Sequence, residues 1–225
     1  ASMIEKREVM TLFRIIPSLA SAKQLNLRAA IDSLGTAGCL HLDMEDGNFI
    51  SNITFGVKTV GEVADYYCGR LDVHLMVRHP ERYLDALFRG NIDSIAIQIE
   101  AMPYPLELMK RIRQSGRRAG IALNPSTPVE PLKYLGDKID YLLIMTAEPD
   151  GEGQSFLPAM LEKISKARSI FPKEVSILTD GGILEEHLSV LANAGADGAV
   201  LGRTIWNSAE PERKYWELTK KINRN

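Results

Sequence analysis

Histidine and aspartate side chains lie at the ends of apolar segments that are typical of buried β-strands. "CLHLD" contains His41 and Asp43, "LDVHLM" contains His74, and "VSILTD" ends in Asp180. Side chains two residues apart on a strand point to the same side, so His41 and Asp43 are expected to project together. Two imidazoles and two carboxylates are ligands that zinc, iron, manganese or cobalt accepts. The residue types therefore indicate a site for one divalent metal ion with positions open for substrate oxygens.

Each of these residues also has a purely structural interpretation. A single buried histidine is commonly a hydrogen-bonded core residue, Asp43 could cap the turn that follows it, and Asp180 precedes two glycines in a possible turn. Their coincidence at predicted strand ends favours a functional site, because burying unpaired carboxylates is costly. His79 and His187 lack such a position, since the first lies in a predicted loop and the second in the middle of a predicted helix.

The elements that would position these side chains alternate regularly along the chain. Eight strand-like runs are expected at 14–20, 39–43, 71–76, 94–99, 119–124, 140–145, 175–180 and 198–202. Helical patterns fill the intervals, for example Leu27, Ile31 and Leu34. Eight β and α units with nearly continuous apolar strands predict an α/β fold, a (β/α)₈ TIM barrel, rather than an open doubly wound sheet. In a barrel of this kind the active site lies at the C-terminal ends of the strands.

Length and composition support one domain and exclude several classes of partner. The 225 residues are expected to form a single domain over 1–225, with 1–12 as an N-terminal extension and Ala1–Ser2 as a cloning remnant. Lysine plus arginine number 27 and aspartate plus glutamate 29, a net charge of −2 that indicates neither a nucleic-acid nor an anionic membrane partner. No apolar run of about 18 residues and no signal-peptide pattern is found. Cys39 and Cys68 are expected to be reduced thiols of a cytoplasmic protein.

Glycine-rich loops follow the last three predicted strands. They are "TAEPDGEGQSF", "DGG" and "LGR", the last ending in Arg203. Loops after the seventh and eighth strands of a barrel often bind phosphate through backbone N–H groups, and glycine lets the backbone approach the anion. Arg203 could add a guanidinium. Alternatively, the glycines could form ordinary turns without binding phosphate, and Arg203 could be a solvated surface residue.

Several segments together resemble the ribulose-phosphate 3-epimerase family over nearly the whole chain. They are "PSLAS", "HLDMEDGNF", "NITFG", "LDVHLMV", "ALNPSTP", "LIMTAEP" with "GQSF", and "TDGGI". The resemblance implies a metal-dependent TIM barrel of the ribulose-phosphate-binding type. Such an enzyme inverts C3 of a ketose phosphate, interconverting D-ribulose 5-phosphate and D-xylulose 5-phosphate, while a sister group acts on allulose 6-phosphate. It also implies a small sugar-phosphate partner and a homo-oligomer.

The resemblance assigns roles residue by residue. The family's metal ligands match His41, Asp43, His74 and Asp180, and its acid/base pair, which acts through an enediolate, matches Asp43 and Asp180. Opposed carboxylates of this kind can remove a proton from one face of C3 and return one to the other. The expected substrate and phosphate contacts are Ser18, His74, Met76, Gly151, Gly153, Gly181, Gly182 and Gly202, and the loop pattern itself adds Arg203.

Some positions depart from the family pattern and are typical of a divergent subgroup. Glu45 stands where a methionine is usual, Gln98 where a histidine is usual, and Arg203 where a serine is usual. Asp150 and Glu152 add negative charge to a loop expected to cover phosphate, which places phosphate recognition itself in question.

Three interpretations therefore stay open from the sequence. The first is a 3-epimerase acting on a pentulose or a hexulose phosphate. The second is a lyase of the related barrels, whose pattern has Asp-x-Lys-x-x-Asp at a strand end; the absence of lysine from "HLDMEDG" disfavours it. The third is a non-catalytic sugar-phosphate binder that has kept the site.

Overall fold

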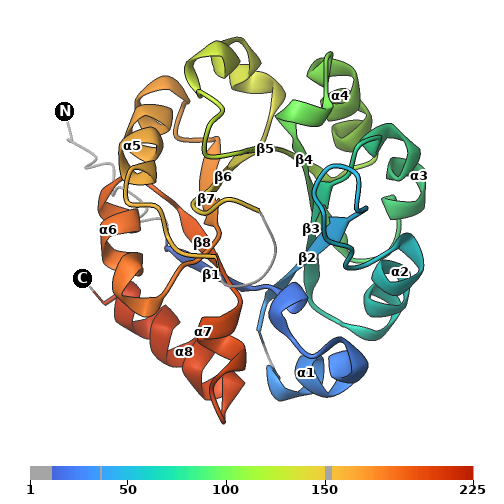
Figure 1. Ribbon diagram of the computed structural model, residues 1–225, viewed down its shortest axis with the longest axis vertical. Coiled ribbons are helices and arrows are strands. Elements are labelled where there is room, and N and C mark those ends of the chain that lie inside the picture. Colours follow the sequence, from blue (N-terminus) through green and yellow to red (C-terminus); the bar gives the residue numbers. More distant parts are fainter. Residues whose placement is uncertain (1–11, 36, 150–153, 225) are drawn as a thin grey trace, which may run out of the picture.

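Eight parallel strands form the centre of the molecule and helices surround them (Figure 1). The computed structural model describes residues 12–35, 37–149 and 154–224. Nearly all of the expected N-terminal extension therefore lies outside the described residues, as do Asp150, Gly151, Glu152 and Gly153.

The strand order is β1-β8-β7-β6-β5-β4-β3-β2, and every pair is parallel. The strands are β1 (Arg14–Pro17), β2 (Cys39–Glu45), β3 (Arg70–Met76), β4 (Ile92–Gln98), β5 (Arg118–Leu123), β6 (Tyr141–Met145), β7 (Ser176–Asp180) and β8 (Gly198–Leu201). This order confirms the predicted (β/α)₈ barrel. The first strand is shorter than expected because the chain turns into a 3-10 helix after Ser18, whereas β2 continues two residues further, to Glu45.

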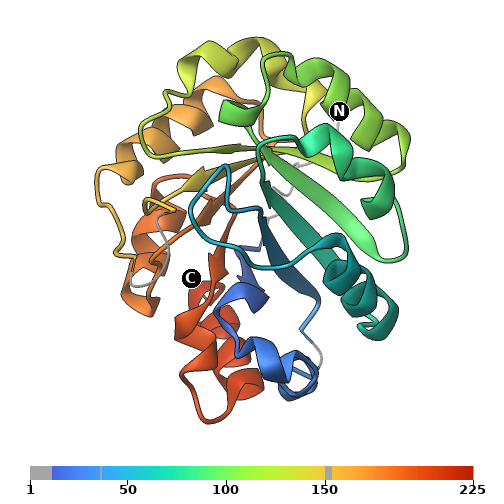
Figure 2. The same cartoon turned by 45° about the vertical axis from the view of Figure 1, so that its right-hand side comes forward.

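Helices connect successive strands and cover the outside of the barrel (Figures 1 and 2). The α-helices are α1 (Leu27–Ser33), α2 (Val57–Tyr66), α3 (Leu84–Leu87), α4 (Pro105–Gln114), α5 (Met160–Ile170), α6 (Leu188–Asn193), α7 (Arg203–Trp206) and α8 (Pro211–Ile222). Short 3-10 helices are η1 (Leu19–Ser21), η2 (Gln24–Asn26), η3 (Pro80–Arg82), η4 (Ile99–Ala101), η5 (Glu130–Lys138) and η6 (Glu185–His187). Among the described residues, none of the helices combines the length and the apolar character needed to cross a membrane.

Alternation along each strand divides the core into two parts. In β6, Leu142 and Ile144 pack with the helices in the large outer cluster, whereas Tyr141 and Leu143 belong to a smaller cluster inside the barrel. The same period of two applies to every strand, because successive side chains point to opposite faces. A polar residue that lies between two outer-cluster residues of the same strand therefore points into the barrel.

The ring of strands closes between β1 and β2 at Ser18. Ser18 forms an isolated parallel bridge with His41, and its backbone N–H donates to the Leu201 carbonyl at 2.9 Å. The Trp206 indole N–H donates to the Ser18 carbonyl at 2.6 Å, which ties the end of α7 to the same point. The closing residue therefore lies directly beside a predicted metal ligand.

The inner cluster should make a measurable contribution to the stability of the barrel. Leu143 is fully buried there, so Leu143→Ala is expected to lower the free energy of unfolding by about 2–5 kcal/mol, through lost transfer energy and the cavity left behind. Leu25 is fully exposed on η2, and Leu25→Ala should change stability by less than about 0.5 kcal/mol. Urea unfolding of both variants checks this. An equal loss of unfolding free energy in the two variants would contradict a packed barrel interior.

Candidate active site

Strand register brings three of the predicted ligands together at the C-terminal end of the barrel. Asp43 in β2 lies opposite His74 in β3, and both belong to the inward-facing set. One carboxylate oxygen of Asp43, Oδ1, lies 3.0 Å from His41 Nε2 and 3.2 Å from His74 Nδ1. Both imidazoles are fully buried and Asp43 is 6 % exposed. Asp43 is therefore the centre of a compact group of two histidines and a carboxylate.

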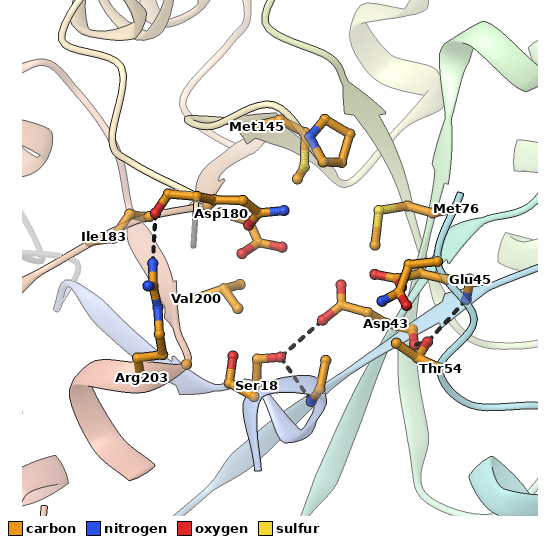
Figure 3. Close-up of a pocket in the computed structure, with 18 of the residues that line it drawn as sticks. Ser18, Asp43, Glu45, Thr54, Met76, Met145, Asp180, Ile183, Val200 and Arg203 are labelled. Carbon is orange, nitrogen blue, oxygen red and sulfur yellow. Dashed lines mark hydrogen bonds between the residues drawn. The ribbon is translucent and has the colours of Figure 1, made fainter. Parts of the chain in front are cut away.

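Asp180 completes this group from β7. Two strands separate β7 from β2 on one side of the ring and four on the other. Asp180 Oδ2 lies 3.5 Å from His41 Nε2 and 3.8 Å from His74 Nδ1. Asp43 and Asp180 point into the same central space in Figure 3. One ligand atom from each of His41, Asp43, His74 and Asp180 lies within 4.8 Å of the others.

The charges of this group are strongly coupled. Burial alone would favour neutral His41, but the charge of Asp43 and hydrogen bonds to Asp180, Asp43 and Asp72 raise the pKa of His41 well above its ordinary value. Burial likewise opposes ionisation of Asp43, yet the charge and hydrogen bond of His41, with those of His74, hold the pKa of Asp43 well below its usual range. Positive charge on the histidines is thus what allows Asp43 to stay ionised inside the barrel.

The four residues fit a divalent cation. Two imidazole nitrogens and two carboxylates form a mixed donor set that zinc, iron, manganese and cobalt accept. His41 Nδ1 is bonded to Asp72, so its other ring nitrogen, Nε2, is the one that faces Asp43 and Asp180. A cation here would replace the proton that His41 holds, so metal binding is expected to release a proton.

A cavity of about 560 Å³ opens above this group. Asp43, Asp180, Met76 and Met145 line it. Figure 3 shows the two methionine side chains along one side, with Glu45 and Arg203 toward opposite ends. Its volume lies in the range of small-molecule sites.

Ser18 lines the same cavity but bonds to the protein. Its hydroxyl donates to Asp43 Oδ2 at 2.9 Å and accepts the Ala20 N–H at 3.3 Å. Ser18 therefore orients the carboxylate of Asp43, and the contact with substrate that the family resemblance implies stays a prediction.

The glycines that follow β7 and β8 also line the cavity, together with Arg203. Gly181 has φ +116° and Gly182 φ +64°, conformations that side chains rarely adopt. A Cβ on Gly182 would lie 2.5 Å from the Phe156 amide nitrogen, and one on Gly202 would overlap the Ser21 hydroxyl. Backbone geometry and space thus both require glycine at 181 and 182, whereas at 202 only the Ser21 side chain opposes a Cβ.

Arg203 is exposed, and its guanidinium donates to the Gln154 carbonyl at 2.6 Å. This bond connects the start of α7 to the loop that follows β6. The two other predicted phosphate glycines of that loop, Gly151 and Gly153, are outside the described residues.

Glu45 faces the cavity from the last position of β2 and is half-buried. Asn52 Nδ2 donates to its carboxylate at 2.7 Å, and its backbone N–H donates to the Thr54 hydroxyl at 3.1 Å. Burial, and after it the charge of Asp43, raise the pKa of Glu45 to about 7. The cavity therefore has an ionisable group beyond the four predicted ligands.

A layer of polar residues below the ligands was not predicted from the sequence. Asp72 lies two residues before His74 on the same inward face, and it accepts hydrogen bonds from His41, Ser94 and Tyr141. The two-residue spacing of Asp72 and His74 could have predicted that Asp72 points into the barrel. Its hydrogen bonds with Ser94 and Tyr141 could not be predicted, because they depend on the register of other strands.

The remaining histidines lie away from the ligand group. His79 Nδ1 is 3.5 Å from Glu81 Oε1 in the loop after β3. His187 is the last residue of η6, directly before α6 begins at Leu188, so it lies within a continuous helical segment as expected. Its Nδ1 accepts the Leu184 N–H at 3.0 Å, and its ring stacks on Phe156. Cys39 and Cys68 are both free thiols, as expected.

Comparisons with known proteins agree with this geometry. The sequence profile of the Ribulose-phosphate 3 epimerase family matches residues 14–206. The chain is 32 % identical to ribulose-phosphate 3-epimerase of Bacillus subtilis (strain 168), over 92 % of this chain and 98 % of that protein. It is 34 % identical to the cytoplasmic isoform of ribulose-phosphate 3-epimerase from Oryza sativa subsp. japonica, over 93 % of this chain and 94 % of that protein.

Solved structures support the fold alone. Orotidine 5'-phosphate decarboxylase from Pyrococcus horikoshii OT3 superimposes with a TM-score of 0.66 at 14 % identity, covering 94 % of this chain and 100 % of that one. Thiamine phosphate pyrophosphorylase from Pyrococcus furiosus gives a TM-score of 0.60 at 14 % identity, over 94 % and 97 % of the two chains.

Fold and sequence together define an enzyme class: a TIM-barrel isomerase that acts on carbohydrate phosphates. The chain belongs to the ribulose-phosphate 3-epimerase family.

Glu45 should make the stability of the metal-free protein depend on pH. Its folded pKa of about 7 lies above the ordinary 4.5, so its favourable contribution is complete below about pH 4.5 and is lost as pH rises through 7. Glu45→Gln removes this loss, and we expect it to stabilise the protein at pH 8 by about 1–3 kcal/mol and much less at pH 5. Urea unfolding with a chelator present measures the difference. A gain independent of pH would contradict the assignment.

Proposed function

We propose that this protein is a metal-dependent ketose-phosphate 3-epimerase that interconverts D-ribulose 5-phosphate and D-xylulose 5-phosphate. The observation that carries the proposal is the placement of Asp43 and Asp180. The two carboxylates come from separated strands of the ring and face one central space beneath a cavity. Membership of the family supplies the substrate class.

Asp43 and Asp180 act as the acid/base pair. Removal of the C3 proton by one carboxylate leaves the electron pair shared with the neighbouring carbonyl as an enediolate. The other carboxyl group, in its protonated form, then gives a proton to the opposite face of C3, which inverts its configuration. In the reverse direction the two groups exchange roles.

His41, Asp43, His74 and Asp180 would hold the divalent cation. When bound, the cation supplies a Lewis acid that offsets negative charge developing on the substrate oxygens. Ser18 keeps Asp43 oriented through the bond to Oδ2, leaving Oδ1 toward the histidines. Met76 and Met145, each 3 % exposed, provide an apolar wall that limits water beside the reacting carbons.

The phosphate is proposed to lie at the end of the cavity formed by Gly181, Gly182, Gly202 and Arg203. Close backbone approach is possible there because none of the three glycines carries a Cβ. Glu45 lies toward the other end, where its charge does not oppose the phosphate (Figure 3). A cytoplasmic location and self-association stay predictions.

Substitution of either acid should stop epimerisation. Asp43→Asn and Asp180→Asn are each expected to lower kcat by roughly 10²–10⁴-fold, the usual contribution of a positioned acid or base. The measurement is conversion of D-ribulose 5-phosphate by zinc-loaded protein, with metal content determined for every variant. Asp65→Asn is the matched control, because Asp65 is an exposed residue of α2 paired with Arg89.

Three outcomes distinguish the alternatives. Wild-type turnover by a metal-loaded Asp43→Asn variant would contradict the two-carboxylate mechanism. Binding of the pentulose phosphate without turnover by the wild-type protein would favour the non-catalytic binder. Faster turnover of a hexulose 6-phosphate than of the pentulose would keep the reaction and change the sugar.

Arg203 should affect binding rather than chemistry. A guanidinium on a phosphate is a strong charge-assisted contact, so Arg203→Ala is expected to raise KM about 10-fold or more with kcat little changed. Steady-state kinetics measures both values. Arg213→Ala on α8, whose arginine pairs with Glu210 and Glu217, serves as the control. A fall in kcat at constant KM would place Arg203 in the chemical step instead.

A further inference from the structure

Asp72 is a buried carboxylate that the proposed proton transfers do not use. It lies in β3, is 1 % exposed, and projects into the barrel beneath the four ligands. Three donors converge on it: His41 Nδ1 at 2.7 Å and the Tyr141 hydroxyl at 2.7 Å, together with the Ser94 hydroxyl. Each donor comes from a different strand.

The geometry sets the direction of these bonds. Asp72 Oδ1 accepts hydrogen bonds from both hydroxyls, and Oδ2 faces His41 Nδ1 at 2.7 Å. A carboxylate oxygen accepts the bond from the imidazole nitrogen that faces it, so His41 Nδ1 carries a proton. The other nitrogen, Nε2, then faces Asp43 and Asp180.

His41 and His74 differ in whether the ring nitrogen that points away from the two carboxylates has a hydrogen-bond partner. His74 presents Nδ1 to the carboxylates, and its Nε2 is buried with no hydrogen-bond partner among the described residues. His41 is held at both ends, since register places it directly opposite Asp72 on the neighbouring strand. Asp72 therefore determines which ring nitrogen of neutral His41 carries the proton.

We propose that Asp72 is a positioning residue that fixes His41 in the Nδ1-protonated tautomer and aims Nε2 at the metal. The inference rests on the proposed metal-dependent function. Carboxylates that hold a ligating imidazole in this way raise its basicity, and their loss typically weakens metal binding. Asp72 touches neither substrate nor metal, so its effect passes entirely through His41.

The first test is zinc affinity, measured by competition with a chromophoric chelator. Asp72→Asn is expected to weaken zinc binding by about 10- to 100-fold. Asp93→Asn is the matched control, because Asp93 is a half-buried aspartate of the adjacent strand that makes no contact with His41. Circular dichroism and thermal unfolding show whether each variant is folded.

The second test needs no substitution. In zinc-loaded wild-type protein labelled with ¹⁵N-histidine, NMR should show His41 protonated on Nδ1, with that proton shifted downfield by its bond to a carboxylate. Protonation on Nε2 instead would overturn the proposal, and so would a folded Asp72→Asn variant with the zinc affinity of the wild type. Failure of the wild-type protein to bind zinc would overturn the proposed function and this inference together.

Discussion

Two aspartates share one small space inside an apolar barrel, and their mutual repulsion is the constraint that the rest of the site must satisfy. Asp43 and Asp180 contribute oxygens to a group only 4.8 Å across, with both histidines beside them. Buried charges of like sign are stable only when positive charge and hydrogen bonds compensate them. Without metal, a proton on His41 provides that compensation; in the proposed metal-bound protein the cation would provide it. Chemistry and stability thus depend on the same electrostatic balance.

The barrel supplies this arrangement through register. Alternation along β2 and β3 sends His41, Asp43, Asp72 and His74 inward, and parallel pairing sets His41 beside Asp72 and Asp43 beside His74. The ring closes at Ser18, whose hydroxyl fixes Asp43. The same residue therefore closes the ring of strands and orients the Asp43 carboxylate. Below this layer, Tyr141 connects the polar group to the apolar inner cluster, so the site is continuous with the core that stabilises the barrel.

The barrel fold and part of the candidate site could be predicted from local sequence patterns. The contacts that depend on which strands are neighbours could not. Alternation along a strand is local, so it placed His41 and Asp43 on one side and indicated a metal site. Apolar runs separated by helical patterns predicted eight strands and the barrel. The role of Asp72 depends on which strands are neighbours and in what register, which no single segment contains. The direction of the Ser18 hydroxyl and the burial of Glu45 depend likewise on tertiary packing.

The central claim is that opposed carboxylates invert C3 of a ketose phosphate. It is tested most directly by proton NMR of D-ribulose 5-phosphate with zinc-loaded protein in deuterated water. The account predicts loss of the C3 proton signal to deuterium together with the appearance of D-xylulose 5-phosphate. Retention of the C3 proton by protein that demonstrably holds zinc and the sugar phosphate would contradict it.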